Sequence, residues 1–326
     1  ELLKRTNDKH KLDFLYDKMK RYYEFLRGRT HGSSCNKFDN GLLTVYDYWY
    51  SCSGMDDYPA QVKMIADKME EHSCPCLTTA QVIRAGKILK MVADYLGKAD
   101  DVAVYDADIA LSEKALNDLA WDEDSGYFGY TMYDKDKNHP YIMKTESGEN
   151  WDKGFDGVYP LISGSVSGER RQRLIDHIKN PKEMWSNAGV SDVDMSASYY
   201  FETDFTYNTY ECFGIQTKRG GWFHNFGGLS APICIWADAY YRPGTVTTGF
   251  DVWTDYQKTT ADSAEISFKY YGKNDKYTII VTLDDSNDYS VKLDGRDIDF
   301  NSRTNGSIEI TLDSSVKSGI ITVTAK

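Results

Sequence analysis

The sequence predicts a mainly α-helical protein with the architecture of an α/α toroid, followed by a small antiparallel β-domain. Two observations predict this division. Apolar residues recur every three to four positions up to about residue 256, and from residue 257 on they alternate with polar residues. In addition, aromatic and acidic residues gather between the expected helices, as in a toroid whose helix pairs present their loops to one cleft. A helical solenoid would need a repeat of fixed period, which the sequence lacks.

The helical pattern has recognisable ends. The first expected helix covers residues 2–27 and stops at Gly28, because glycine adopts the left-handed conformation that often closes a helix. Another covers residues 78–97, with Thr78 as the expected N-terminal cap and Gly97 as the stop. Further helices are expected at residues 60–72, 106–120, 168–179 and 230–241.

The β pattern consists of runs rich in Val, Ile, Thr and Tyr, separated by turns of Asn, Asp, Gly and Ser. We expect strands at residues 264–271, 277–283, 288–294, 306–312 and 319–325. The junction is placed at residues 255–262, so that residues 1–256 form the toroid domain and residues 257–326 the β-sandwich-like domain. Because this second domain has few aromatic residues that we expect to be exposed, we expect it to cap the toroid rather than to carry a binding site of its own.

The chain is acidic, with a formal net charge of −12. This charge disfavours binding to nucleic acid or to an anionic membrane. No apolar run approaches the roughly 20 residues that span a bilayer, and no signal peptide is recognised at residue 1. We therefore expect a soluble protein, cytoplasmic or secreted, and a fragment or processed product because the sequence opens without Met. The six cysteines lack metal-type spacing and are expected to be reduced, partly buried thiols. The sequence leaves the oligomeric state open.

One segment combines carboxylates with aromatic rings. Residues 46–50 read Tyr-Asp-Tyr-Trp-Tyr, and residues 53–59 read Ser-Gly-Met-Asp-Asp-Tyr-Pro. Aromatic faces stack on sugar rings, and a carboxyl beside a second carboxylate and apolar surface keeps its proton to higher pH. The segment therefore suits a sugar and a proton donor for its glycosidic bond. The alternative is a surface turn with two solvated aspartates.

Glycoside hydrolysis usually needs a second carboxylate. Glu211 is the best candidate, because it lies among aromatic residues ahead of the glycine-rich segment 220–228. The alternative is a structural glutamate paired with Arg219 or Lys218. Asp156 is weaker, since it could contact sugar hydroxyls but a turn role is favoured. The glycine-rich segment lacks the preceding strand and spacing of a phosphate-binding loop.

Together these segments resemble glycoside hydrolase family 63 and its mannosylglycerate-hydrolase-like relatives. Residues 53–59 look like the family's Ser-Gly-(Leu/Met)-Asp-(Asp/Asn)-x-Pro motif, Trp121 to Tyr130 is similar to its hairpin, and residues 210–213 look like its base loop. The resemblance implies an (α/α)6-type toroid and an inverting enzyme that acts on α-linked glucosides, mannosides or related oligosaccharides. It places the general acid at Asp56 and the general base at Glu211.

The inverting reaction implies that the two carboxyl groups stand roughly 6.5–9.5 Å apart. It needs no metal, and we expect no cofactor. The remaining expected contacts to the substrate are of three kinds. Asp57 and Tyr58 lie beside the acid, aromatic rings stack on the sugar, and two polar side chains contact its hydroxyls. The rings are Trp49, Tyr48, Trp222 and Phe226, and the polar side chains are Arg219 and His224.

Two departures from the family pattern stand out. A Trp-x-Gly-x-x-Trp segment and a helix pair are missing after Tyr200, and the expected helices are too few for a closed toroid. We therefore expect an incomplete toroid and predict a spatial break between residues 201 and 202, with α-carbons further apart than about 3.8 Å. Two other classes of function stay open. One is a non-catalytic carbohydrate-binding chain or pseudoenzyme of the same fold. The other is a toroid-fold isomerase or lyase that uses His224 with a second histidine.

Overall fold

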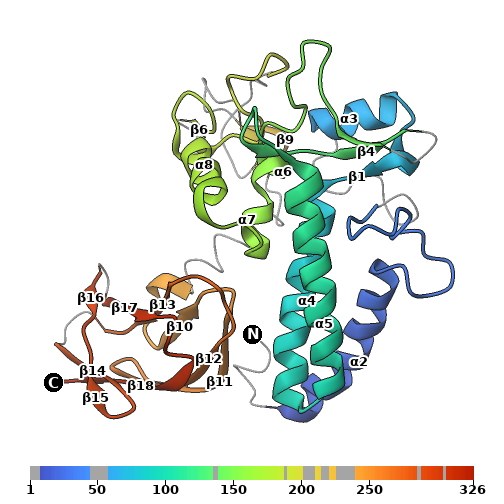
Figure 1. Ribbon diagram of the computed structural model, residues 1–326. Helices are drawn as coiled ribbons and strands as arrows, with labels where there is room; N and C mark the ends of the chain where they lie inside the picture. The colour runs from blue at the N-terminus through green and yellow to red at the C-terminus, as the bar shows by residue number, and fades with distance from the viewer. Residues whose placement is uncertain are drawn as a thin grey trace. The chain divides into compact units, whose positions relative to one another are not determined.

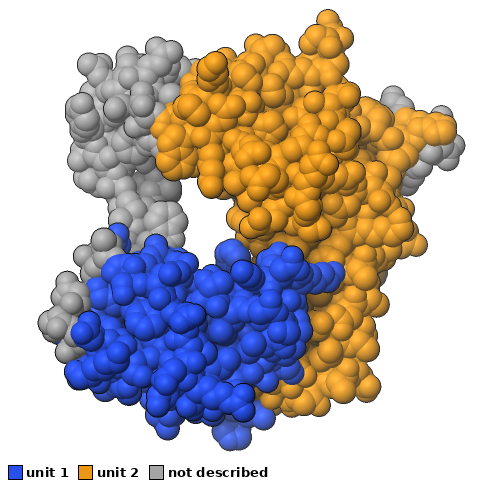
Figure 2. Space-filling view, turned by 60° about the vertical axis from the view of Figure 1, so that its left-hand side comes forward, with its two compact units in different colours: residues 1–12, 208–211, 222–326 blue, residues 13–207, 212–221 orange. Residues whose placement is uncertain are grey.

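The chain divides into two compact units (Figure 2). A helical unit comprises residues 13–207 and 212–221, and a β unit comprises residues 1–12, 208–211 and 222–326. The computed structural model describes residues 8–44, 58–134, 139–186, 189–200, 210–213, 220–224, 239–284, 288–303 and 306–326, without the side chains of residues 189, 210–213 and 220–224.

Three long helices lie side by side in the helical unit (Figure 1). They are α2 (Lys9–Leu26), α4 (Cys76–Leu96) and α5 (Ala99–Ala115). Gly86 of α4 allows close packing, because a Cβ at this position would lie 3.0 Å from the Tyr23 hydroxyl of α2 and 3.3 Å from Ile109 of α5. The absence of a side chain at one position thus lets both neighbouring helices approach α4.

A buried polar network joins α2 to α5. Tyr16 donates a hydrogen bond of 2.6 Å to Asp101, and Tyr23 donates one of 3.2 Å to Asp108. Asp108 is buried, and the guanidinium groups of Arg27 and Arg29 both contact it. These contacts offset the cost of burying polar groups between two helices.

The helix predictions that fall on described residues hold with shifted ends, whereas most of the helix predicted at residues 230–241 lies outside the described residues. Residues 60–72 form α3 (Pro59–Ala66) and a 3₁₀ turn, η1 (Glu70–His72), and residues 168–179 form α8 (Gly168–Lys179). Thr78 is not the N-cap of α4, because the extended backbone of Pro75 starts this helix at Cys76. The helix predicted at 106–120 starts earlier, as α5, and ends in the π-helical turn η2 (Leu116–Ala120).

Short elements complete the helical unit. β1 (Ser73–Cys74), β4 (Thr131–Tyr133) and β5 (Pro140–Ile142) form a sheet in the order β1-β4-β5. The remaining pairs and turns are β2 (Trp121–Asp122) with β3 (Tyr127–Phe128), α6 (Phe155–Val158), α7 (Pro160–Ser163) and β6 (Trp185–Ser186) with β7 (Gly189–Val190). Two further strands, β8 (Tyr210–Phe213) and β9 (Gly220–His224), each have residues in both units and pair in a two-stranded sheet.

The β unit is built from two antiparallel sheets. The first has the order β10-β13-β17-β16 and the second the order β11-β12-β18-β14-β15. Side chains from both sheets, among them Phe268 and Ile310, share one apolar core. The strands are β10 (Thr245–Thr248), β11 (Val252–Thr259), β12 (Ser263–Tyr270), β13 (Lys276–Thr282), β14 (Tyr289–Leu293), β15 (Arg296–Asp297), β16 (Asn301–Ser302), β17 (Ser307–Asp313) and β18 (Ser318–Ala325).

The structure confirms helices followed by antiparallel sheets. Each of the five predicted strands matches one of β12, β13, β14, β17 and β18. Residues 255–262, where the junction was expected, include the second half of β11 and its turn into β12, and the first strand of the two large sheets, β10, begins at Thr245. The closed toroid and the division of the chain at 256/257 stay predictions. Across the described ranges, no helix is both long and apolar enough to cross a membrane.

Candidate functional site

Most residues predicted for the site lie outside the described part of the chain. These are Tyr48, Trp49, Asp56, Asp57, Arg219 and Phe226, together with the junction between residues 201 and 202. Glu211 belongs to strand β8, and Trp222 and His224 belong to strand β9, but their side chains are not described. Tyr58 is the predicted site residue whose side chain the structure describes.

Tyr58 is a buried anchor at the end of the Ser-Gly-Met-Asp-Asp-Tyr-Pro motif. Its backbone is extended, as expected for a residue before proline, and Pro59 begins α3. The side chain is 2% exposed and packs in a cluster that includes Met64, Leu77 and Tyr130. Sugar contact through Tyr58 stays a prediction, but this burial favours a role in packing the motif onto the protein.

The phenol of Tyr58 reaches the loop that carries two buried aspartates, Asp152 and Asp156. A Cβ on Gly154, between them, would lie 3.0 Å from the Tyr58 hydroxyl and 2.3 Å from the carbonyl oxygen of Asp192. A Cβ on Gly157 would lie 2.1 Å from the carbonyl oxygen of Asp152. Because a side chain fits at neither glycine, the loop is tightly folded, and the carboxyl groups of Asp152 and Asp156 interact electrostatically.

The two carboxyl groups are held by neutral donors. The Cys76 thiol donates a 3.2 Å hydrogen bond to Asp152 Oδ2, and the Tyr130 hydroxyl donates one of 2.8 Å to Asp156 Oδ2. Asp156 Oδ1 is buried and has no hydrogen-bond partner among the described residues. Both aspartates are fully buried, and neither forms an ion pair with Lys or Arg in the described ranges. This environment differs from that of Asp108, whose charge two arginines balance.

Burial without a counter-charge favours the protonated carboxyl groups. Desolvation raises the pKa of Asp156 to about 7, and the hydrogen bond from Tyr130 opposes the rise. Desolvation, and then the charge of Asp156, raise the pKa of Asp152 well above its usual range, against the opposing contacts of Cys76 and Tyr58. The pair therefore holds at least one proton near neutral pH. We call Asp152 and Asp156 the buried carboxyl pair.

The sequence indicated only one member of this pair. Asp156 was expected to contact sugar or to shape a turn, and in the structure its side chain is completely buried. Asp152 was not predicted. The available signal was the spacing in Trp-Asp-Lys-Gly-Phe-Asp-Gly, because two carboxyl groups four residues apart with a glycine between them suit a tight loop.

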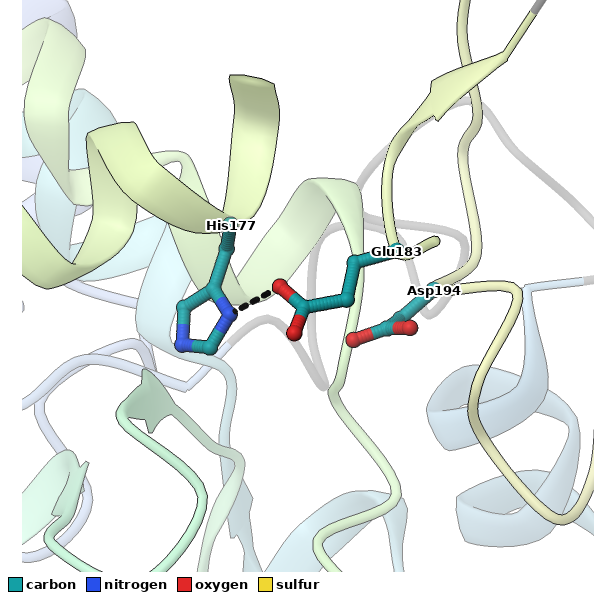
Figure 3. Close-up of side chains that lie close together, drawn as sticks. All are labelled: His177, Glu183 and Asp194. Carbon is teal, nitrogen blue, oxygen red and sulfur yellow. Dashed lines mark hydrogen bonds and ion pairs between the residues drawn. The ribbon is translucent and has the colours of Figure 1, made fainter. Parts of the chain in front are cut away.

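A second polar cluster joins His177, Glu183 and Asp194 (Figure 3). One ligand atom from each residue lies within 4.8 Å of the others, and the side-chain types suit a zinc-like ion. However, His177 Nδ1 lies 2.6 Å from Glu183 Oε2. Two ligands of one tetrahedral zinc would stand about 3.3 Å apart, given bonds of roughly 2.0–2.1 Å. The observed distance is that of a hydrogen bond, so we interpret the cluster as a polar link and assign it no metal.

This polar link fastens α8 to the loop after β7. Tyr127 stacks on the His177 ring with centroids 4.1 Å apart, and its hydroxyl donates a 2.8 Å hydrogen bond to Asp194. Ser196 donates two hydrogen bonds to the other carboxylate oxygen of Asp194. The polar link is connected to the loop of the buried carboxyl pair, because Gly154 of that loop forms a β-bridge with Val193, the residue before Asp194.

Comparison with known families decides the affiliation of the chain. Residues 3–211, well over half of the sequence, match the model of the glycosyl hydrolase family 63 C-terminal domain. The chain belongs to glycosyl hydrolase family 63. The matched range contains the Ser-Gly-Met-Asp-Asp-Tyr-Pro motif and the buried carboxyl pair, and its last residue is Glu211. This confirms the resemblance seen in the sequence, and membership of this family supports glycosidase activity.

One solved structure of family 63 supports the assignment at the level of the fold. The GH63 mannosylglycerate hydrolase from Thermus thermophilus in complex with glucose has a TM-score of 0.51 at 14% identity. The match covers 70% of this chain and 69% of that one. The same enzyme in complex with Tris gives 0.41 at 15% identity, covering 60% of this chain and 54% of that chain. The α-L-rhamnosidase from Dictyoglumus thermophilum gives 0.40 at 14% identity, covering 98% and 38%. No curated protein matches the chain.

Proposed function

We propose that this family 63 chain is the catalytic part of an inverting glycoside hydrolase that cleaves α-linked glucosides, mannosides or related oligosaccharides. The observation that carries the proposal is the family match, because residues 3–211 include both Asp56 and Glu211. The structural similarity to a mannosylglycerate hydrolase solved with glucose supports a hexose as part of the substrate.

In the proposed reaction Asp56 donates a proton to the glycosidic oxygen as the bond to the anomeric carbon breaks. Glu211 removes a proton from a water molecule, and the oxygen of this water bonds to the anomeric carbon from the opposite face. The configuration inverts in one step, which requires roughly 6.5–9.5 Å between the two carboxyl groups. Asp57 keeps Asp56 protonated by like-charge repulsion.

We also propose how the sugar is held. Aromatic faces stack on the ring, and a guanidinium and an imidazole contact its hydroxyl groups, which leaves the two carboxyl groups free for proton transfer. The proposed stacking residues are Tyr48, Trp49, Trp222 and Phe226, and the proposed hydroxyl contacts are Arg219 and His224.

The decisive experiment measures reducing-sugar release from a panel of α-linked gluco- and manno-disaccharides. Asp56→Asn and Glu211→Gln should each lower kcat by at least ~100-fold, because general acid–base catalysis contributes on that order or more. The matched control is Glu146→Gln, an exposed turn residue that should leave activity unchanged. Proton NMR of the first-formed product should show the inverted anomer.

Three results would contradict the proposal, in whole or in part. Activity that survives both active-site substitutions would remove these carboxylates from the mechanism. Sugar binding without hydrolysis across the whole panel would instead indicate a non-catalytic carbohydrate-binding chain of the same fold. A retained anomeric configuration would contradict inversion while leaving hydrolase activity in place.

A further inference from the structure

Tyr58 connects the motif that carries the proposed general acid to the buried carboxyl pair. It is bonded to Asp57, so its α-carbon lies no more than two peptide units, about 7.6 Å, from that of Asp56. Its ring is buried, and its hydroxyl lies against Gly154, between Asp152 and Asp156. A movement of the loop that carries Asp152 and Asp156 would therefore displace Tyr58 and, with it, the end of the acid motif.

Among the residues that the structure describes, neutral groups face the buried carboxyl pair. They are the Tyr58 phenol, the Cys76 thiol at the start of α4, the Tyr130 phenol before β4 and the Tyr199 phenol. The ammonium group of the neighbouring Lys153 forms an ion pair with Glu149 instead, at 2.9 Å. A second negative charge on the pair would thus be both buried and repelled by the first.

The described backbone around the pair is tightly fixed. The backbone amide of Asp152 donates a 2.9 Å hydrogen bond to Asn150 Oδ1, and the amide of Phe155 donates one of 2.7 Å to the carbonyl oxygen of Asp192. Gly154 and Gly157 have no space for even a methyl group. Separating the two carboxylates therefore has to shift the loop against Tyr58.

We propose that Tyr58, Asp152 and Asp156 form a positioning cluster for the motif at residues 53–59, and that the cluster holds this motif in place only while the carboxyl pair keeps a proton. The inference rests on the proposed function in one respect, that the motif carries the general acid. If the positioning cluster acts in this way, activity falls at high pH because the buried carboxyl pair ionises, and not only because the general acid Asp56 ionises. This loss affects kcat, because the acid is misplaced, more than it affects KM.

The first test does not require activity. Hydrogen–deuterium exchange of a peptide covering residues 45–58 is compared at pH 6.0 and 8.5, after correction for the intrinsic exchange rate. Wild-type protein should lose protection in this peptide at the higher pH, whereas Asp156→Asn, whose amide cannot ionise, should not. Tyr58→Phe should lower protection at both pH values. Asp176→Asn, which removes an exposed carboxylate on α8, should behave like wild type.

The second test uses the pH profile on a substrate that the wild-type protein hydrolyses. Asp156→Asn should move the alkaline limb of kcat to higher pH by about one unit or more, because the pair then carries at most one charge. Asp156→Ala should lower kcat at every pH, since it also removes the acceptor for Tyr130.

The outcomes separate this inference from the proposed function. Equal exchange in wild type and Asp156→Asn at pH 8.5, or superimposed alkaline limbs, would overturn the positioning cluster even if hydrolysis is established. Conversely, a protein that hydrolyses nothing but shows the expected exchange pattern would remove the hydrolase proposal and keep the positioning cluster.

Discussion

The buried carboxyl pair should make the stability of the helical unit depend on pH in an unusual direction. The folded-state pKa of Asp156 is raised from 3.8 to about 7. A carboxyl group whose pKa is raised by folding stabilises the protein fully below its unfolded pKa, and this contribution is lost as the pH rises through the folded pKa. We therefore expect the free energy of unfolding to fall between about pH 4 and pH 7.

The size of this effect follows from the same values. One pKa unit is worth about 1.4 kcal/mol, so a rise from 3.8 to about 7 corresponds to roughly 4 kcal/mol. Asp156 is fully buried, so solvent screening does not reduce this figure. Against a typical total stability of about 5–15 kcal/mol, the loss should be readily measured.

Urea unfolding followed by circular dichroism at 222 nm, at several pH values from 4.5 to 7.5, measures the effect. Asp156→Asn cannot ionise, so its stability relative to wild type should increase across this range by up to the same ~4 kcal/mol. Carboxylates whose pKa is lowered by folding, such as Asp101 and Glu149, act in both proteins and cancel in the difference. Parallel stability curves for wild type and Asp156→Asn would refute the reasoning, and Asp176→Asn serves as the control.

Three further predictions concern packing. Asp108→Ala should destabilise the protein by about 3–5 kcal/mol in urea unfolding because it leaves the buried guanidinium of Arg27 without its carboxylate partner. Asp106→Ala, which breaks an exposed pair, should change stability by no more than about 1 kcal/mol. Gly157→Ala should cost about 1–3 kcal/mol in the same assay through overpacking. In the β unit, Phe268→Ala should cost about 3–5 kcal/mol, whereas Phe250→Ala, at an exposed position, should stay within about 0.5 kcal/mol in thermal unfolding. Equal losses of stability in Asp108→Ala and Asp106→Ala, or in Phe268→Ala and Phe250→Ala, would contradict the differences in burial from which these values are derived.

Local patterns predicted much of the fold. The strand expected at residues 264–271 is β12, Ser263–Tyr270, because alternation and turn residues act over a few positions. β11 escaped detection because its register shifts between Thr254 and Tyr256, which interrupts the alternation. The helix end at Gly97 was predictable for the same local reason, since this glycine adopts the left-handed conformation at the C-cap.

The candidate site, too, was predictable only where neighbouring residues encode it. Residue types and their order pointed to the acid motif at residues 53–59 and to Glu211, and the family match includes both. Nothing local distinguishes Asp152 from the many solvated aspartates of this acidic chain. Its environment is created by Cys76, which lies 76 positions away in sequence, and by Tyr58.

The sequence by itself determined the order of helices and strands, the family and the proposed pair of catalytic carboxylates, because each is encoded in neighbouring residues or in a motif. The tertiary structure alone decided which groups surround each buried carboxyl group. Asp108 and Asp156 are both buried aspartates, but two arginines contact the first, whereas among the described residues the side-chain donor to the second is the neutral Tyr130 hydroxyl. A pKa depends on which groups folding brings together, and that information is not local to any segment of the chain.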